Sequence, residues 1–155
     1  MAVHNWIYQG YDINSITDMQ RHCPKVWGFV YKLTLREKKS SGAIAFEYIG
    51  KKNVYTKRKR VFGKKETAAL KDKRKKAYEY VIKEGDWKSY VSSNKFIKEN
   101  SAKYDIFREI ILFCTNDNDL TYQEAKHIIC SDALEDPKYL NDGVSIRRFG
   151  KKIID

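Results

Sequence analysis

Several residue types that define whole classes of protein are scarce in this sequence. The three cysteines, Cys23, Cys114 and Cys130, lie far apart, which predicts reduced thiols rather than a disulfide framework or a structural zinc site. His22 and Cys23 together would supply only two of the four ligands that structural zinc takes. With two prolines and eight glycines among 155 residues, there is little room for linkers or low-complexity tails.

Long apolar runs are also missing. No stretch approaches the roughly 18–20 residues that span a bilayer, and the first residues lack the basic and apolar regions of a secretory signal. We therefore expect a soluble, intracellular protein. With 42% hydrophobic and 14% aromatic residues, the chain can still bury one core, as a single domain of this length requires.

Acidic residues are few beside basic ones. Twenty acids face 31 lysines and arginines, which gives a net charge of +11. Thirteen of these cations lie in residues 51–76, where only Glu66 and Asp72 are acidic. So dense a positive charge predicts a polyanionic partner, with nucleic acid as the first reading and an anionic membrane surface as the second. A membrane-binding helix would carry bulky apolar residues opposite its charge, and this stretch holds too few of them.

The middle of the chain predicts two neighbouring strands. Residues 26–35 are rich in β-branched and aromatic side chains that alternate with the period of a strand. A polar loop and a second strand at residues 43–49 complete an antiparallel hairpin, and the apolar run at residues 107–114 suits a buried third strand. The predicted fold is α+β, with a small three-stranded antiparallel sheet, made of the hairpin and the later strand, flanked by helices.

The basic stretch predicts a helix. Residues 65–83 favour helical structure that Gly85 ends, so we expect a basic helical insertion at about residues 62–85. It would belong to a single domain over residues 26–155. Residues 1–25 are expected to form a leading arm.

Shorter helices are expected elsewhere. The leading arm predicts one helical turn capped by Ser15 or Asp18, and a short helix should carry Phe96. Thr121 is expected to cap a helix that runs to about residue 134, with Glu124 three positions on completing a capping-box spacing.

Four residues have the chemistry that the hydrolysis of a phosphodiester bond needs. Tyr31 and Tyr48 end neighbouring strands of the hairpin, Arg58 follows Tyr48 by ten positions, and Glu124 lies early in a later helix. A guanidinium suits a phosphate because it is permanently charged and fork-shaped, and a carboxylate suits a hard divalent cation. Each residue also has an ordinary reading, with the tyrosines as strand aromatics and Glu124 as a capping acid.

The hairpin resembles the two signature elements of the GIY-YIG endonuclease superfamily. Phe29-Val30-Tyr31 is similar to the first element in its tyrosine, and Tyr48-Ile49-Gly50 matches the second letter for letter. The similarity is closest to small stand-alone phage-type members and covers most of the chain, residues 28–141. The sequence departs from the family pattern in its long hairpin loop and at three positions. Phe29 replaces the first-motif glycine, Phe62 lies near the place of a histidine in some members, and Val91 stands where phage-type members have glycine.

The resemblance implies a Mg²⁺-dependent DNA endonuclease, with Mn²⁺ as the alternative metal and no small-molecule cofactor. Glu124 looks like the single metal-binding glutamate, and Arg58 like the arginine that binds the scissile phosphate from the helix after the second element. One hairpin tyrosine would act as general base towards water; we favour Tyr31 as the base and Tyr48 for positioning. Asn141 resembles an asparagine found late in the domain, although a turn residue is an equal reading.

The partner implied is DNA, and no membrane. The residues expected to contact nucleic acid are Lys51, Lys52, Asn53, Lys57, Arg60, Lys64, Arg74 and Asn141. The protein would act in the cytoplasm, that of the host cell if the chain is phage-encoded. The rival hypothesis is a non-catalytic or weakly active nucleic-acid-binding protein that keeps the fold. Monomer and dimer remain equally open.

Overall fold

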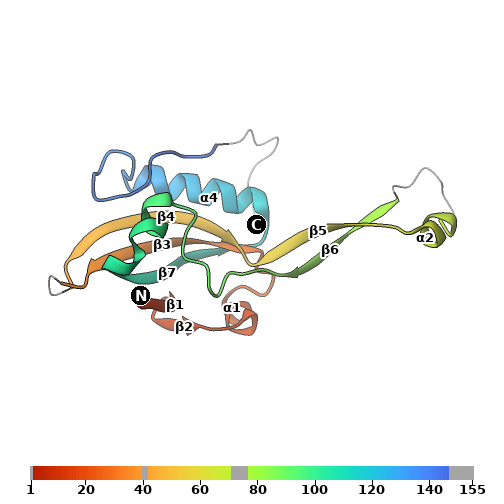
Figure 1. Ribbon diagram of the computed structural model, residues 1–155, viewed down its shortest axis with the longest axis horizontal. Coiled ribbons are helices and arrows are strands. Elements are labelled where there is room, and N and C mark those ends of the chain that lie inside the picture. The colour runs from red at the N-terminus through yellow and green to blue at the C-terminus, as the bar shows by residue number, and fades with distance from the viewer. Residues whose placement is uncertain (1, 40–41, 71–76, 147–155) are drawn as a thin grey trace. The chain divides into compact units, whose positions relative to one another are not determined.

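The structure is a computed structural model of the 155-residue chain, and it describes residues 2–39, 42–70 and 77–146. The chain divides into two compact units (Figure 1). The first comprises Met1–Val54 and Asp86–Asp155, and the second comprises Tyr55–Gly85. No helix in the described ranges is long and apolar enough to cross a membrane.

A five-stranded sheet forms the centre of the first unit. Its strands are β1 (Ala2–Tyr8), β2 (Tyr11–Ile13), β3 (Gly28–Glu37), β4 (Ile44–Asn53) and β7 (Tyr104–Cys114). They lie in the order β2-β1-β7-β3-β4, and all neighbours are antiparallel except β1 and β7, which are parallel. The α+β class and the antiparallel trio of β3, β4 and β7 are confirmed. The predicted three-stranded sheet is wrong in size, because β1 and β2 extend it.

The two extra strands come from residues 1–25, the predicted leading arm. β1 pairs with β7 from Ala2 opposite Asp105 to Ile7 opposite Glu109. This pairing joins segments about a hundred residues apart, so no local pattern announces it. The helical turn expected here is α1 (Ile16–His22), and its N-cap is Ser15, whose hydroxyl accepts a hydrogen bond from the Asp18 amide at 3.2 Å.

One face of the sheet is covered by α4 (Asp117–Cys130), which begins earlier than predicted. Its N-cap is Asn116, whose side chain accepts a hydrogen bond from the Asp119 amide at 2.8 Å. The prediction of Thr121 as the cap is wrong, because Asn116 is a strong N-cap and two acids in the next turn favour the helix dipole. Glu124 therefore lies in the middle of α4, and its capping-box role is excluded.

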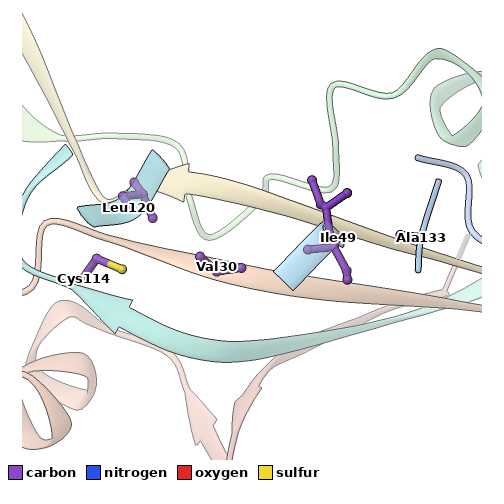
Figure 2. Close-up of a cluster of buried hydrophobic side chains, with 6 residues drawn as sticks. Val30, Ile49, Cys114, Leu120 and Ala133 are labelled. Carbon is purple, nitrogen blue, oxygen red and sulfur yellow. The ribbon is translucent and has the colours of Figure 1, made fainter. Parts of the chain in front are cut away.

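The core between α4 and the sheet consists of small and branched apolar side chains (Figure 2). Its buried members are Val30, Ile49, Cys114, Leu120, Ile128 and Ala133. Gly28 permits the close approach of the helix, since a Cβ atom there would lie 2.6 Å from Cδ2 of Leu120. Two shorter helices, α3 (Lys95–Asn100) and a 3₁₀ helix at Ser101–Lys103, precede β7. The predicted helix around Phe96 is thus confirmed.

The opposite face of the sheet is aromatic and holds one buried cation. Arg108 on β7 is 7% exposed, and its guanidinium lies 4.6 Å from the ring centroid of Trp6. It donates hydrogen bonds to the carbonyl oxygens of His4 at 2.7 Å, Lys88 at 2.8 Å and Tyr90 at 2.8 Å. Burial lowers the pKa of Arg108 to about 10, so the side chain stays charged at neutral pH. Arg108 thereby ties the segment around Tyr90 to the sheet.

The outer edge of β4 is held by the segment that follows α4. The Glu47 amide donates to the Lys138 carbonyl at 2.9 Å, and the Leu140 amide donates to the Glu47 carbonyl at 2.8 Å. Asn141 accepts from the Ile49 amide at 3.0 Å and donates to the Ile49 carbonyl at 2.8 Å. These bonds satisfy backbone groups that an edge strand otherwise leaves unpaired.

The second unit is a two-stranded antiparallel ribbon of β5 (Tyr55–Val61) and β6 (Tyr78–Glu84), with the short helix α2 (Lys64–Ala68) between them. Figure 1 shows the two strands running side by side. The predicted helix over residues 65–83 is wrong for its last part, because residues 78–83 belong to β6, and residues 71–76 lie outside the described residues. Its last part, Tyr-Glu-Tyr-Val-Ile, is aromatic and β-branched, and such residues favour a strand once a partner is available. Arg58 accordingly lies on β5 and not on a helix.

Replacing the buried cation tests its structural role. Arg108→Met keeps a stem that packs on Trp6 but leaves three carbonyl oxygens without their donor. The free energy of unfolding should fall by about 2–4 kcal/mol, as measured by urea denaturation. Arg21→Met is the control, since that side chain is 74% exposed and pairs with Asp18 at the surface; it should change stability by at most about 0.5 kcal/mol. Equal denaturation midpoints for both variants would contradict the role of Arg108.

Candidate active site

The two hairpin tyrosines meet at a glycine. Tyr31 on β3 lies directly opposite Gly50 on β4. A Cβ atom at Gly50 would lie 2.5 Å from the Tyr31 hydroxyl oxygen, 2.6 Å from its Cζ and 3.0 Å from Cε1 of Tyr48. No L side chain fits in that space, so the glycine of the Tyr-Ile-Gly element makes room for both rings.

The Tyr31 hydroxyl is enclosed in a cluster of hydroxyl groups. The residue is 1% exposed, and its hydroxyl makes hydrogen bonds with the side chains of Tyr90 and Ser92. Burial raises the pKa of Tyr31 well above its usual value, and the neighbouring Tyr90 and Tyr48 add to the rise. Tyr31 is therefore a buried, neutral phenol that anchors the cluster.

Tyr48 is less enclosed. It is half-buried, and its oxygen makes hydrogen bonds with Ser93 and Ser92 that favour the phenolate. Burial nevertheless raises the pKa of Tyr48, and the negative charge of Glu124 adds to the rise. The two side chains come from β4 and α4, yet they lie close enough for one charge to act on the other.

Glu124 lies beside a lysine of β4. Its Oε2 atom is 4.0 Å from Nζ of Lys51, which donates a hydrogen bond to Oγ1 of Thr121 at 2.8 Å. Burial raises the pKa of the Glu124 carboxyl, and the Lys51 ammonium opposes the rise. The Glu124 carboxylate is thus partly desolvated, and the Lys51 ammonium is a counter-charge at the limit of ion-pair distance.

This arrangement fits one hard divalent cation. Across the described ranges, no three His, Cys, Asp or Glu side chains come together as a metal-binding group. Among the four clustered residues Tyr31, Tyr48, Lys51 and Glu124, only Glu124 has a carboxylate, so a metal bound among them would take Glu124 as its acidic ligand. Mg²⁺ suits such a donor set, because it keeps several waters and is often bound through one or two carboxylates and substrate phosphate.

The remaining predicted DNA contacts of the first unit lie around the same strand. Nζ of Lys52 pairs with Oδ1 of Asp86 at 2.6 Å and lies 4.0 Å from the ring centroid of Tyr90. Asn53 is exposed at the end of β4. Asn141 uses both polar atoms of its amide on the Ile49 backbone, so it holds β4 in place.

The other predicted site residues belong to the second unit. Arg58 is exposed on β5 opposite Val81. The exposed cations around it are Lys57, Arg60 and Lys64. Arg74 lies outside the described residues. The residues that the first unit brings together are Tyr31, Tyr48, Lys51 and Glu124.

Sequence reasoning missed the hydroxyl groups that surround the tyrosines. They are Tyr90, Ser92 and Ser93, together with Thr121 beside Lys51. The run Ser89-Tyr90-Val91-Ser92-Ser93 is rich in hydroxyl groups, which was the available signal. Its placement depends on Arg108, whose bonds to backbone carbonyls leave no trace in the local pattern.

Comparison with known proteins identifies the family of the chain. A family model described as "Putative endonuclease segE, GIY-YIG domain" matches residues 6–144. No curated protein and no solved structure matches the chain. The matched range begins in β1 and ends beyond Asn141, so it includes all of the clustered site residues.

The raised pKa of Glu124 predicts a pH-dependent cost to stability. An acid with a higher pKa in the folded state than in the unfolded state loses stability as pH rises through that folded pKa. Glu124→Gln removes this loss, so the melting temperature of the variant should exceed that of the wild type at pH 7. The difference should shrink as the pH falls and approach zero at about pH 3, where the carboxyl is protonated in both states.

Melting curves in metal-free buffer across this pH range check the prediction. Glu135→Gln, at an exposed position of the same charge, is the matched control. If Glu124→Gln is less stable than the wild type at pH 7, the folded state stabilises the charged carboxylate. That result would contradict a destabilising burial of Glu124.

Proposed function

Since the chain belongs to the GIY-YIG endonuclease family, we propose that it is a DNA endonuclease that hydrolyses phosphodiester bonds with one divalent cation. The observation that carries this proposal is the pairing of Glu124 with Lys51, whose Oε2 and Nζ atoms lie 4.0 Å apart. The charge of Glu124 also reaches Tyr48 and adds to its raised pKa, so a hydroxyl, a partly desolvated carboxylate and a cation belong to one region of the first unit. These are the groups that water activation and phosphate binding require.

Glu124 would hold the cation, with Mg²⁺ first and Mn²⁺ as the alternative. When bound, such an ion polarises a non-bridging phosphate oxygen and offsets the charge of the leaving oxygen. The raised pKa of Glu124 supports this assignment, because a partly desolvated carboxylate gains more from a new counter-charge than a solvated one.

Tyr48 is the better candidate for the general base. Tyr31 is 1% exposed and its pKa is raised well above the usual value, so its phenolate is strongly disfavoured. Tyr48 is half-buried, and hydrogen bonds with Ser93 and Ser92 favour its phenolate. A cation bound to Glu124 would offset the carboxylate charge and so remove one cause of the raised pKa of Tyr48. We therefore move the proposed base from Tyr31 to Tyr48, and assign Tyr31 to positioning.

In the proposed reaction, the phenolate of Tyr48 takes a proton from water while the water oxygen bonds to phosphorus. The bond from phosphorus to the leaving oxygen breaks, and that oxygen is protonated from solvent. Lys51 and Lys52 would bind non-bridging oxygens of the DNA. Arg58 is proposed, from the family resemblance, as the residue that binds the scissile phosphate.

A non-catalytic nucleic-acid-binding protein is the second candidate. The observation in its favour is the concentration of exposed cations on the second unit, which binding alone would use. A cleavage experiment separates the two functions.

Plasmid DNA should be nicked or cut by the protein with Mg²⁺ and spared with EDTA. Glu124→Ala should reduce the cleavage rate by at least about a hundredfold, because it removes the proposed metal ligand. DNA binding, measured by anisotropy without metal, should remain within about twofold of the wild type.

The control for this experiment is Glu135→Ala, an exposed carboxylate outside the site. Mg²⁺ should also raise the melting temperature of the wild type and leave that of Glu124→Ala unchanged. Cleavage by Glu124→Ala at the wild-type rate would overturn the assignment. Binding of DNA by the wild type without metal-dependent cleavage would favour the second candidate.

The choice of base predicts a difference between the two tyrosines. Tyr48→Phe should lower the single-turnover cleavage rate by about a hundredfold or more, as expected for loss of a general base. Since the pKa of Tyr48 is raised above 10, the wild-type rate should climb with pH from 7 to 10, and this climb should vanish in Tyr48→Phe. In Tyr31→Phe, the cleavage rate should still increase with pH, and the free energy of unfolding should fall. A pH-dependent Tyr48→Phe enzyme would refute the role of Tyr48.

A further inference from the structure

The second unit holds most of the surplus positive charge of the protein. Its 31 residues, Tyr55–Gly85, contain twelve lysines and arginines and four acids, a net charge of +8 out of +11 for the whole chain. The first unit, with its sheet and α4, is close to neutral by comparison. A polyanion is therefore attracted chiefly by the ribbon.

Both faces of the ribbon are exposed, and both carry cations. Residues opposite each other in an antiparallel pair share a face. One face carries Lys57 and Lys59, opposite Ile82 and Tyr80. The other face carries Arg58, Arg60 and Lys83. All of these side chains are exposed, so neither face is used to build a core.

The lysines of the first face are held in place by tyrosine rings. Nζ of Lys59 lies 4.0 Å from the ring centroid of Tyr78, and Nζ of Lys57 lies 4.9 Å from that of Tyr80. The two rings contact each other edge to face, with centroids 5.6 Å apart. Such support reduces the rotamer entropy that the lysines would lose on binding a phosphate. It also places an ammonium over each of these rings, where a nucleic-acid base would otherwise stack.

On the second face, Arg60 has a structural task. Its guanidinium donates to Glu79 on β6 at 2.7 Å and to Glu66 on α2 at 2.9 Å. These bonds join β5 to β6 and to α2, and they offset the charge of Arg60. Lys83 and Arg58 are the remaining cations of this face, so phosphate binding there falls to them.

We propose that the β5–β6 ribbon enters the major groove of duplex DNA and is bound there between the two phosphate backbones. The B-form major groove is about 12 Å wide and admits a two-stranded ribbon, whose strands lie about 4.8 Å apart. A ribbon resting on a flat array of phosphates would use the cations of one face. In a groove, phosphates flank it on both sides, so both sets of cations are used. The ribbon, about 23 Å long, spans roughly two-thirds of a helical turn.

This inference rests on the proposed function for the identity of the nucleic acid as DNA. It extends that function by assigning the choice of B-form duplex to the ribbon. A-form RNA duplexes carry the same charge on each strand, but their major groove is too narrow and deep for side chains to enter. Groove insertion and flat phosphate binding therefore predict different preferences between the two duplexes.

The test measures binding and not cleavage, with the full chain carrying Glu124→Gln and with no metal added. Fluorescence anisotropy compares a DNA duplex with an RNA duplex of the same sequence. The DNA duplex should bind at least about tenfold more tightly. Lys57→Gln combined with Lys59→Gln should lower DNA affinity at least about tenfold, flatten the slope of log K against log salt by about 2 and remove the DNA preference.

Lys98→Gln combined with Lys103→Gln is the matched control, since it removes two exposed lysines from the first unit. It should keep the DNA preference. Equal affinity for the two duplexes, or a preference that survives the ribbon substitutions, would overturn groove insertion. Neither result would touch the proposed nuclease activity, which is measured separately with Mg²⁺. Conversely, if the protein prefers duplex DNA through its ribbon but never cleaves it, the proposed nuclease activity is refuted and the proposed groove binding stands.

Discussion

The packing of Tyr31 across Gly50 is the constraint on which the arrangement of the site depends. The Tyr31 ring fills the space that a Cβ atom at position 50 would need, which fits β3 and β4 to this one register. A slip by one residue would send every side chain of β4 to the opposite face. Tyr48 would then leave its hydroxyl partners, and Lys51 would leave Thr121.

The same register explains how the site uses both faces of β4. Successive side chains of a strand point to opposite faces, so Tyr48 turns to Ser92 and Ser93 while Lys51 turns to α4. β4 is the last strand in the order of the sheet, and at such an edge groups from both faces can come close. The charge of Glu124 on α4 reaches across this edge and adds to the raised pKa of Tyr48. The bonds of Asn141 to the Ile49 backbone keep this edge in place.

The parts of the fold that could be predicted are those whose cause is local. Alternating β-branched and aromatic residues were enough for β3 and β4, and an apolar run was enough for β7. β1 was missed because its partner lies about a hundred residues away. β6 was missed because lysine-rich sequence before it favours a helix, whereas pairing with β5 decides the outcome. α4 was found, but its start was placed at Thr121 because the stronger cap at Asn116 was not weighed.

The sequence predicted the candidate site residues but not the side chains that surround them. Tyr48 and Glu124 stand out by residue type and by their place in the family pattern. Their pKa values could not be predicted, because these values depend on burial and on partners such as Ser93 that are distant in the sequence. The proposal of Tyr48 in place of Tyr31 as the base follows from this difference, since only the structure shows which ring is enclosed.

Burial of Tyr48 and Glu124 also gives a reason for positive charge beside the proposed site. Burial raises the pKa of Tyr48 and of Glu124, so it disfavours their charged forms. The proposed hydrolysis would add negative charge at the same place, and cations would offset both effects. A tight lysine partner for Glu124 would neutralise the carboxylate before a metal ion reached it. Lys51, at 4.0 Å, leaves the carboxylate without a tight ion pair, and the larger surplus of positive charge belongs to Tyr55–Gly85.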